Sequence, residues 1–335
     1  MTKKKCNVIM TCMKKNLCEG TCDQDARLLF ENEDSIAYRV ENGEGELTIT
    51  EYPVFPGIWL CYKDAHIQTY TYPPSYPAGV LEITHCREGR FEYDAGDQFF
   101  YLTKGDMAVC RSAGSGTSVY CPTGHYHGVS VIVDPALTPR CLSCFLADVQ
   151  VKPAALLEKF CGENRYFIMR STARLEHIFS ELYTVPENIR KGYLKVKVLE
   201  LFLFLSSLDP TLSQSGQRSC RKSQVELAKD VCRFINEHMD RRLTISQLAE
   251  QFYVSPARLK KCFYSVYGES IQTYLRAYKM RAAAQLLKTT DTPVAQIAAS
   301  FGYDNSSKFS RAFRDVMGVS PTEYRKSSYC SRRSQ

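Results

Sequence analysis

An internal repeat in the last third of the chain constrains the fold more than any other feature of the sequence. Residues Ile245–Arg276 match Val294–Arg325, first at an offset of 49 residues and then at an offset of 50. The extra residue falls between Val254 and Leu259, where a turn is predicted. Because an insertion in a turn changes no buried helical face, the repeat is structural. The matched pairs are Ile245 and Val294, Gln247 and Gln296, Leu248 and Ile297, Ala249 and Ala298, Phe252 and Phe301, Phe263 and Phe313, Gly268 and Gly318, and Tyr274 and Tyr324.

Each copy of the repeat is predicted to be two short helices joined by a turn. In the first copy, Ser255-Pro256 supplies the N-cap serine and the N1 proline that begin a second helix. In the second copy, Asp304 or Asn305 is the expected cap. On each second helix the apolar residues face inwards and the polar residues face outwards. The outward residues are Arg258, Lys260 and Lys261 in the first copy and Ser306, Ser307, Lys308 and Arg311 in the second.

A short basic helix that follows a tight turn is what the major groove of DNA accepts. Between the two copies, the 18 residues Ile271–Lys288 are predicted to form a helix, which would measure about 27 Å. A spacer of that length can hold two such helices in successive major grooves, roughly 34 Å apart along DNA. The alternative is a repeat that only packs helices together and leaves its basic faces in solvent.

Charge is divided unevenly along the chain. Residues 221–335 hold 20 Lys and Arg against 10 Asp and Glu, whereas residues 1–220 hold 23 against 26. A basic region beside a mildly acidic one indicates that only the C-terminal part meets a polyanion. Charge alone does not distinguish a DNA-binding surface from a solvated basic face, so the prediction of DNA binding rests on the repeat.

These motifs resemble the AraC/XylS family of bacterial transcription regulators. The resemblance covers about 100 residues, Gln224 to Lys326, and is carried by the repeat, the helix Tyr274–Leu287 and the closing run Ile297–Arg325. It implies a sequence-specific DNA-binding domain with two helix-turn-helix units. Ala257 offers a base edge only apolar contact, so the second unit is the better equipped reader. The base-reading positions that the resemblance implies are Ala257, Lys260, Lys261, Ser306, Ser307, Lys308 and Arg311.

The first two hundred residues follow other patterns. Between residues 30 and 150, short β-branched or aromatic stretches alternate with turn residues, which is typical of a β-sandwich or a small barrel. After Pro153 the period becomes helical, and one helix is strongly apolar. A small sheet would cover that helix poorly, so we expect a second copy of the chain to cover it; packing within the chain is the alternative. Its apolar residues are Leu194, Val198, Leu201, Phe202 and Leu205.

The sequence therefore predicts an α+β protein with five parts. A looser resemblance to two-domain members of the family implies that the β-barrel is cupin-like and binds an effector, and that the helices after it dimerise. The parts are an extension at 1–29, the cupin-like β-barrel at 30–150, the dimerisation helices at 151–208, a linker at 209–220 and an all-α tandem helix-turn-helix domain at 221–327.

The cupin-like resemblance rests on Gly116, Pro122, Gly124 and His127, although Val131 stands where that motif ends in Asn. The candidate effector contacts are His66, Arg87, His125 and His127. Because a metal centre needs three or four ligands and only His125 and His127 are paired, no metal or other cofactor is expected. Histidines that merely close the barrel mouth, or that do hold a metal, are the alternatives.

We expect a non-enzymatic, effector-responsive regulator, mostly an activator, that binds double-stranded DNA as a homodimer and contacts RNA polymerase. The chain shows no signal sequence and no bilayer-length apolar run, so it is predicted to be cytoplasmic and free of membrane. One alternative is a cupin-type metal enzyme fused to a DNA-binding domain, although its ligand set is missing. The other is a thiol redox sensor that uses Cys12, Cys18 and Cys22 or the pair Cys141 and Cys144.

Overall fold

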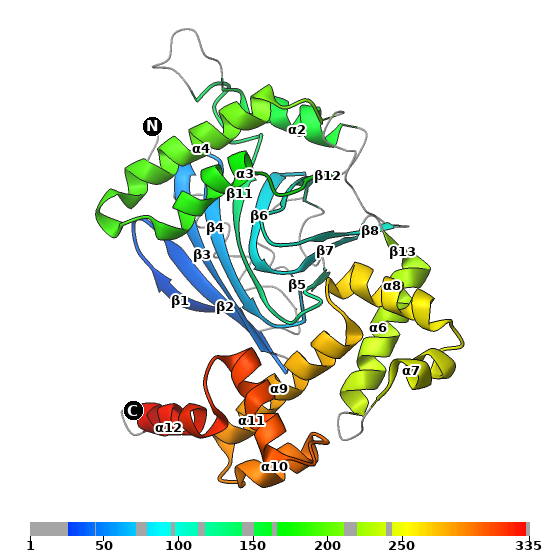
Figure 1. Cartoon of the computed structure of the whole chain (residues 1–335). Coiled ribbons are helices and arrows are strands. Elements are labelled where there is room, and N and C mark those ends of the chain that lie inside the picture. The colour runs from blue at the N-terminus through cyan, green and yellow to red at the C-terminus, as the bar shows by residue number, and fades with distance from the viewer. Residues whose placement is uncertain are drawn as a thin grey trace. The chain divides into compact units, whose positions relative to one another are not determined.

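The computed structural model describes residues 26–43, 45–71, 79–94, 98–112, 118–142, 151–162, 166–210, 220–238 and 243–332. The chain divides into two compact units, Met1–Ser219 and Cys220–Gln335 (Figure 1). The first unit combines an antiparallel β structure with helices, and the second is helical, so the α+β prediction is confirmed at this level. Among the helices of these ranges, none is long and apolar enough to cross a membrane.

The first unit is built on an eight-stranded antiparallel sheet in the order β1-β2-β3-β4-β11-β6-β9-β12 (Figure 1). Two short antiparallel pairs accompany it: β5 (Thr69–Thr71) with β10 (Ser118–Tyr120), and β7 (Phe91–Asp94) with β8 (Gln98–Leu102). The strands of the main sheet are β1 (Ala26–Glu31), β2 (Ile36–Asn42), β3 (Gly45–Phe55), β4 (Ile58–His66), β6 (Leu81–Gly89), β9 (Met107–Arg111), β11 (Tyr126–Val133) and β12 (Tyr166–Met169).

Alternation along the strands gives the main sheet two apolar faces, because successive side chains of a strand point to opposite sides. On one face Leu60, Ile83 and Val131 join the core formed with the helices α2 (Pro153–Cys161), α3 (Ala173–Ser180) and α4 (Arg190–Ser207). We call this the helix-side face. The opposite face packs against side chains of the short pairs, such as Tyr70, Phe91, Phe100 and Val119.

A charged pair is buried in the part of the sheet that faces the short pairs. Lys63 Nζ lies 2.6 Å from Glu82 Oε1, and the two residues are 3% and 8% exposed. Burial alone would raise the pKa of Glu82, but the Lys63 charge and the hydrogen bonds from Lys63 and Thr84 hold it below its ordinary value. The pair lies in a mostly apolar core, where an unpaired charge would be costly.

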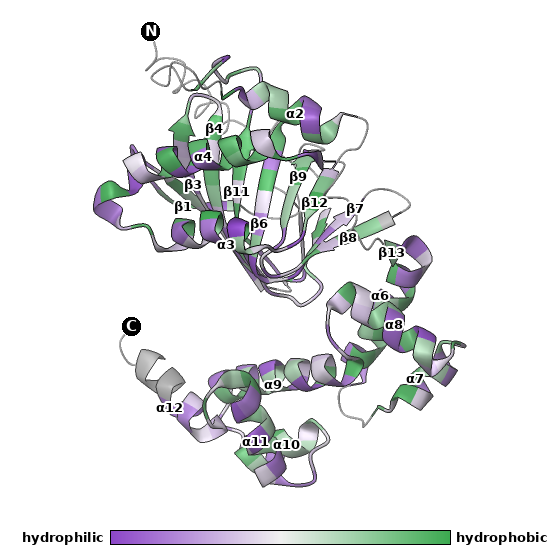
Figure 2. Cartoon of the chain, turned by 45° about the horizontal axis from the view of Figure 1, so that its top comes forward, coloured by the Kyte–Doolittle hydropathy of each residue, from purple (hydrophilic) through white to green (hydrophobic). Residues whose placement is uncertain are grey.

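The apolar face of α4 is covered within the chain, so the expected cover by a second copy is wrong and the alternative, packing within the chain, is confirmed. Leu194, Leu201 and Phe202 are at most 2% exposed and belong to the helix-side core. Figure 2 shows hydrophobic stretches in α4 and in the strands beneath it. The sheet is broad enough to cover this helix because eight strands form one sheet, and α2 and α3 contribute to the same core.

A strand inside the region predicted to be helical is a second correction. Residues 151–208 form α2, α3 and α4, but Tyr166–Met169 form β12, which pairs with β9 at the edge of the main sheet. Phe167 and Ile168 are both buried and face opposite cores, which is the pattern of a strand covered on both sides. Four residues are too few for the helical period of their neighbours to exclude a strand.

His85 on β6 ties the helix layer to the sheet. Its ring stacks on Phe179 of α3 at 4.2 Å, and its Nδ1 lies 3.0 Å from the hydroxyl of Tyr183 in the 3-10 turn η1 (Glu181–Thr184). Burial lowers the pKa of His85 from 6.5 to about 4, with the nearby Asp106 carboxylate opposing the shift. The folded protein therefore resists protonating a side chain that the unfolded chain protonates readily.

We expect the first unit to lose stability as the pH falls from 7 to 4, because only the unfolded state takes up the His85 proton in that window. The contribution from this side chain is about 3 kcal/mol. Unfolding followed by the fluorescence of the single tryptophan, Trp59, reports on this unit. His85→Phe should lose less stability over the same range than the wild type, whereas the exposed-site control His177→Gln should match the wild type. Parallel curves for wild type and His85→Phe would contradict the assignment.

The second unit consists of helices that follow the short strand β13 (Cys220–Arg221). Helices α6 and α7 pack on α8 around the buried residues Val225, Leu248 and Phe263. A second core gathers Met280, Leu287, Ile297 and Phe309 with further side chains of α9 to α11. The helices are α6 (Lys222–Glu237), α7 (Ile245–Gln251), α8 (Pro256–Tyr267), α9 (Ile271–Thr289), α10 (Val294–Ser300), α11 (Ser306–Met317) and α12 (Pro321–Arg332).

Candidate functional site

The repeat folds into two helix pairs of equal dimensions. Helices α7 and α10 have 7 residues each, and α8 and α11 have 12 residues each. The first pair is joined by residues 252–255 and the second by residues 301–305. The extra residue of the second copy therefore lies in the turn, as the sequence predicted.

Helices α8 and α11 are each capped at the N-terminus by a side-chain oxygen that accepts hydrogen bonds from backbone N–H groups. Ser255 Oγ accepts from the N–H of Arg258 at 3.3 Å. Asn305 Oδ1 accepts from the N–H of Ser307 at 2.7 Å and from that of Lys308 at 3.4 Å. Asn305, and not Asp304, is thus the cap of the second copy. Each cap satisfies donors that a helix start leaves without a partner, which fixes where the outer face begins.

An aromatic pair at matched positions holds the inner side of each second helix. Phe263 and Tyr274 meet edge to face at 5.4 Å and 75°, and Phe313 and Tyr324 meet at 5.7 Å and 76°. Both phenylalanines are fully buried. The two copies therefore bury the same side of α8 and α11 in the same way, which leaves the opposite sides uncovered within the second unit.

The uncovered side of α8 carries all four residues predicted for DNA contact. Ala257, Arg258, Lys260 and Lys261 are exposed. Tyr264 is 59% exposed and lies three residues after Lys261 and four after Lys260, so it belongs to the same face. Sequence reasoning missed it because aromatic residues at helical spacing are usually core, although the spacing itself pointed outwards.

The uncovered side of α11 is basic and also contains a hollow. The four predicted residues Ser306, Ser307, Lys308 and Arg311 are exposed. An open hollow of about 620 Å³ runs along this face. Ser310, Arg314 and Asp315 also line it and were not predicted; they continue the face at three- and four-residue steps. The complete lining is Ser306, Ser307, Ser310, Arg311, Arg314 and Asp315.

Helix α9 connects the two copies and packs in both. Near its start Tyr274 contacts the rings of Phe263 and Tyr267 in the first copy. Further along, buried Lys279 donates from Nζ to the carbonyl of Phe301 at 2.8 Å, at the end of α10. Its 19 residues measure about 28 Å. A continuous helix that packs against both copies fixes the distance between them.

The four predicted effector residues of the first unit form one surface cluster. The rings of His66, His125 and His127 lie 4.5 to 5.3 Å apart. Glu88 links Arg87 to them, with its carboxylate oxygens 3.8 Å from Arg87 Nε and 3.6 Å from His125 Nε2. The premise that only His125 and His127 are paired is therefore wrong, because His66 joins them.

The strand register brings these histidines together. In the β4–β11 ladder His127 stands opposite Asp64, and Tyr126 stands opposite Ala65. One step further, the same register places His125 opposite His66. Because His127 lies two residues before Val129 and Asp64 lies two after Tyr62, the cluster is on the helix-side face and not on the face that packs against the short pairs. Gly89 allows the close approach: a Cβ there would lie 1.9 Å from the His125 carbonyl oxygen.

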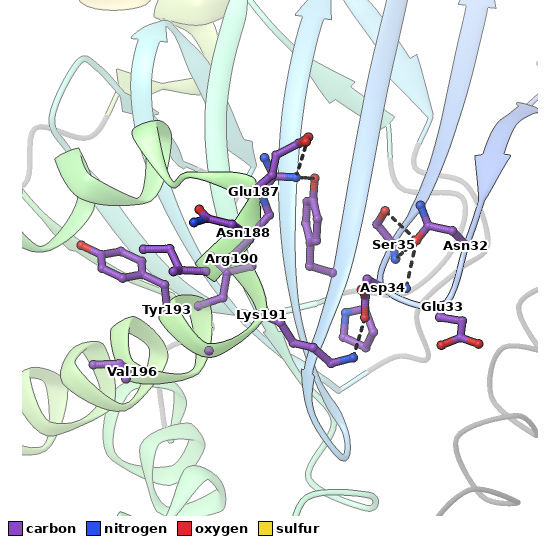
Figure 3. A pocket seen from close by; sticks show the side chains of 15 residues that line it. Asn32, Glu33, Asp34, Ser35, Glu187, Asn188, Arg190, Lys191, Tyr193 and Val196 are labelled. Carbon is purple, nitrogen blue, oxygen red and sulfur yellow. Dashed lines mark hydrogen bonds and ion pairs between the residues drawn. The ribbon is translucent and has the colours of Figure 1, made fainter.

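A separate groove of about 1050 Å³ lies at the start of α4, between the turn η2 (Glu187–Ile189) and the loop from β1 to β2. Figure 3 shows Lys191 reaching across it to Asp34, at 2.5 Å. None of the four predicted effector residues lines this groove. Its lining is mostly charged or polar, with Ile189 and Val196 of the α4 region among the apolar exceptions.

The cysteines of the thiol alternative are only partly placed. Cys12, Cys18, Cys22 and Cys144 lie outside the described residues, as does Gly116 of the cupin-like motif, and Cys141 is half-buried. Several other thiols are buried, and burial raises the pKa of Cys121 to about 12 and that of Cys161 to about 11. Such thiols carry little thiolate at neutral pH and react slowly with oxidants.

The second unit is similar to known regulatory proteins. Residues 248–327 match the helix-turn-helix domain family. The chain is 27% identical over 163 residues to the arabinose operon regulatory protein of Escherichia coli K12, covering 48% of this chain and 56% of that protein. It is 32% identical over 103 residues to the regulatory protein SoxS of Escherichia coli K12, covering 31% of this chain and 96% of SoxS.

The C-terminal domain of AraT, a response regulator from Geobacillus stearothermophilus, is 35% identical, with 30% of this chain and 84% of that chain covered and a TM-score of 0.30. The chain spans 56% of the length of the arabinose operon regulatory protein. By name, these proteins are regulators.

We expect Asn305→Ala to destabilise the second unit by about 1 kcal/mol, because two N–H groups at the start of α11 lose their acceptor. Asp304→Ala is the matched control and should change stability by less than about 0.5 kcal/mol. Helix content followed by circular dichroism during thermal unfolding measures both. A larger effect for Asp304→Ala than for Asn305→Ala would contradict the observed cap.

Proposed function

Because the chain belongs to the AraC/XylS family of transcription regulators, we propose that it is a sequence-specific DNA-binding transcription regulator. The observation that carries this proposal is the pair of equal helices α8 and α11, each held by the same buried aromatic contact and each with an uncovered outer face. These faces carry arginine, lysine and serine side chains, which suit base edges and phosphates.

We assign the reading of base edges chiefly to α11. We assign to α8 chiefly the phosphate contacts that position the protein on the duplex. Arg311 lines the hollow along α11, and a guanidinium can make two parallel hydrogen bonds to guanine. On α8, Lys260 and Lys261 are point charges suited to phosphate or to guanine, Ala257 offers apolar contact only, and Tyr264 adds a hydroxyl and a ring. With α9 between them, the two helices would enter successive major grooves on one side of the duplex.

We expect Arg311→Ala to weaken binding to a selected site by about 1–3 kcal/mol and binding to unrelated DNA less, whereas Lys261→Ala on the positioning helix should weaken binding to both DNAs alike. Fluorescence anisotropy with both DNAs at one fixed salt concentration measures this, since phosphate contacts depend on salt. The control is Arg233→Ala, which removes an exposed arginine of α6 that pairs with Asp230. An equal loss on all sequences for Arg311→Ala would mean that Arg311 contacts only phosphate, and would contradict the assignment.

The first unit is proposed to receive an effector and to dimerise. Ile189, Val196 and Leu203 are 48%, 62% and 39% exposed and recur every seven residues on and just before α4, opposite its buried face. A seven-residue apolar spacing is suited to pairing with another helix. A homodimer of this kind places two DNA-binding units on one operator. Effector binding would change how they are disposed, and in most cases activate transcription through contact with RNA polymerase in the cytoplasm.

We expect Leu203→Glu to shift the chain from dimer to monomer, because it places a charge within the α4 contact. Sedimentation or light scattering at micromolar concentration measures the mass. Ser180→Glu adds the same charge at an exposed position of α3 and should stay dimeric. A dimer that persists in Leu203→Glu would place the contact elsewhere.

A further inference from the structure

We propose that the first unit binds one divalent transition-metal ion, of the zinc class, between His66, His125 and His127. Each histidine offers one ring nitrogen, and the three nitrogens lie within 4.8 Å of one another. This proposal replaces the expectation of no metal, whose premise was that only two of these histidines are paired. It concerns the first unit alone and does not depend on DNA binding by the second.

The geometry needs only a small closure around an ion. Zinc binds imidazole nitrogen at about 2.0–2.1 Å, so three tetrahedral ligands lie about 3.3 Å from one another. The side chains of His125 and His127 are 30% exposed and that of His66 is 52% exposed, so their outer parts can rotate without disturbing a core. Their backbones are held by the β4–β11 ladder and by the turn at Gly89.

One ring nitrogen already lacks a conventional partner. Nε2 of His127 is shielded from solvent and makes no hydrogen bond in the described part of the chain. The Asp64 carboxylate lies 3.2 Å from it and 3.0 Å from Nε2 of His66, so one oxygen faces two imidazoles. A cation at this point would take the nitrogen lone pairs and would be partly neutralised by Asp64.

The chemistry of the donors selects the class of ion. Imidazole suits zinc, copper, nickel and iron, whereas calcium and magnesium prefer oxygen ligands. Three imidazoles leave a fourth position for water or for Asp64, and that carboxylate supplies the charge balance. The three histidine side chains are 30% to 52% exposed, so a bound ion would be open to exchange with solvent.

The test is metal binding by the full chain after treatment with a chelator. Calorimetric titration with Zn²⁺ should give one site per chain that weakens at least 100-fold in His66→Ala and in His127→Ala. Asp64→Asn should weaken it by about 10–100-fold, the range for a residue that supports a ligand. His177→Ala, which removes an exposed histidine of α3 outside the cluster, is the matched control and should bind as the wild type does.

Cysteine thiols are the competing ligands, because the chain holds 15 of them. Co²⁺ distinguishes the two, since thiolate ligation adds a strong near-ultraviolet charge-transfer band that an imidazole site lacks. We expect visible cobalt bands without that band, lost in His66→Ala and kept when Cys12, Cys18 and Cys22 are all changed to Ser. Zinc affinity that is unchanged in both histidine variants, or a cobalt spectrum dominated by thiolate, would overturn the proposal. Metal-free unfolding followed by Trp59 shows that each variant is folded.

Discussion

Helix α9 packs into two cores at once, and the arrangement of the candidate DNA-binding surface depends on that contact. At one end Tyr274 meets the aromatic rings of the first copy. Towards the other end, Met280, Ala283 and Leu287 are fully buried in the core of the second copy. Neither copy can slide along α9 without exposing these side chains, at a cost of roughly 25 cal/mol for each Å² of apolar surface. The continuous helix α9 therefore holds the two helix pairs at a fixed spacing within one candidate DNA-binding surface.

Much of the second unit could be predicted from its sequence because its signals are local. Apolar periods, the Ser255-Pro256 cap and the insertion in the turn all report on neighbours within a few residues. What the sequence left open was also local. Asp304 and Asn305 are equally good caps by residue type, and only the backbone geometry selects Asn305. Tyr264 was missed because its residue type favours a core while its position on the helix is exposed.

The first unit was harder to predict because its decisive contacts depend on strand pairing. His66 and His127 are 61 residues apart, and they meet only because β4 and β11 pair with Asp64 opposite His127. A register shift of one residue would turn one of them to the other face. In the same way, the cover of α4 comes from a sheet whose strand order no local pattern records. The strand Tyr166–Met169 can be recognised only from its pairing with β9.

The central claim is that α8 and α11 contact DNA together, at a spacing set by α9. Hydroxyl-radical footprinting of the full chain on a selected site tests this most directly. The account predicts pairs of protected segments about one helical turn, 10–10.5 base pairs, apart on the same face of the duplex. Arg311→Ala should lose protection in one segment of each pair and Lys261→Ala in the other. A single protected segment for each protomer, or loss of the same segment in both variants, would contradict it.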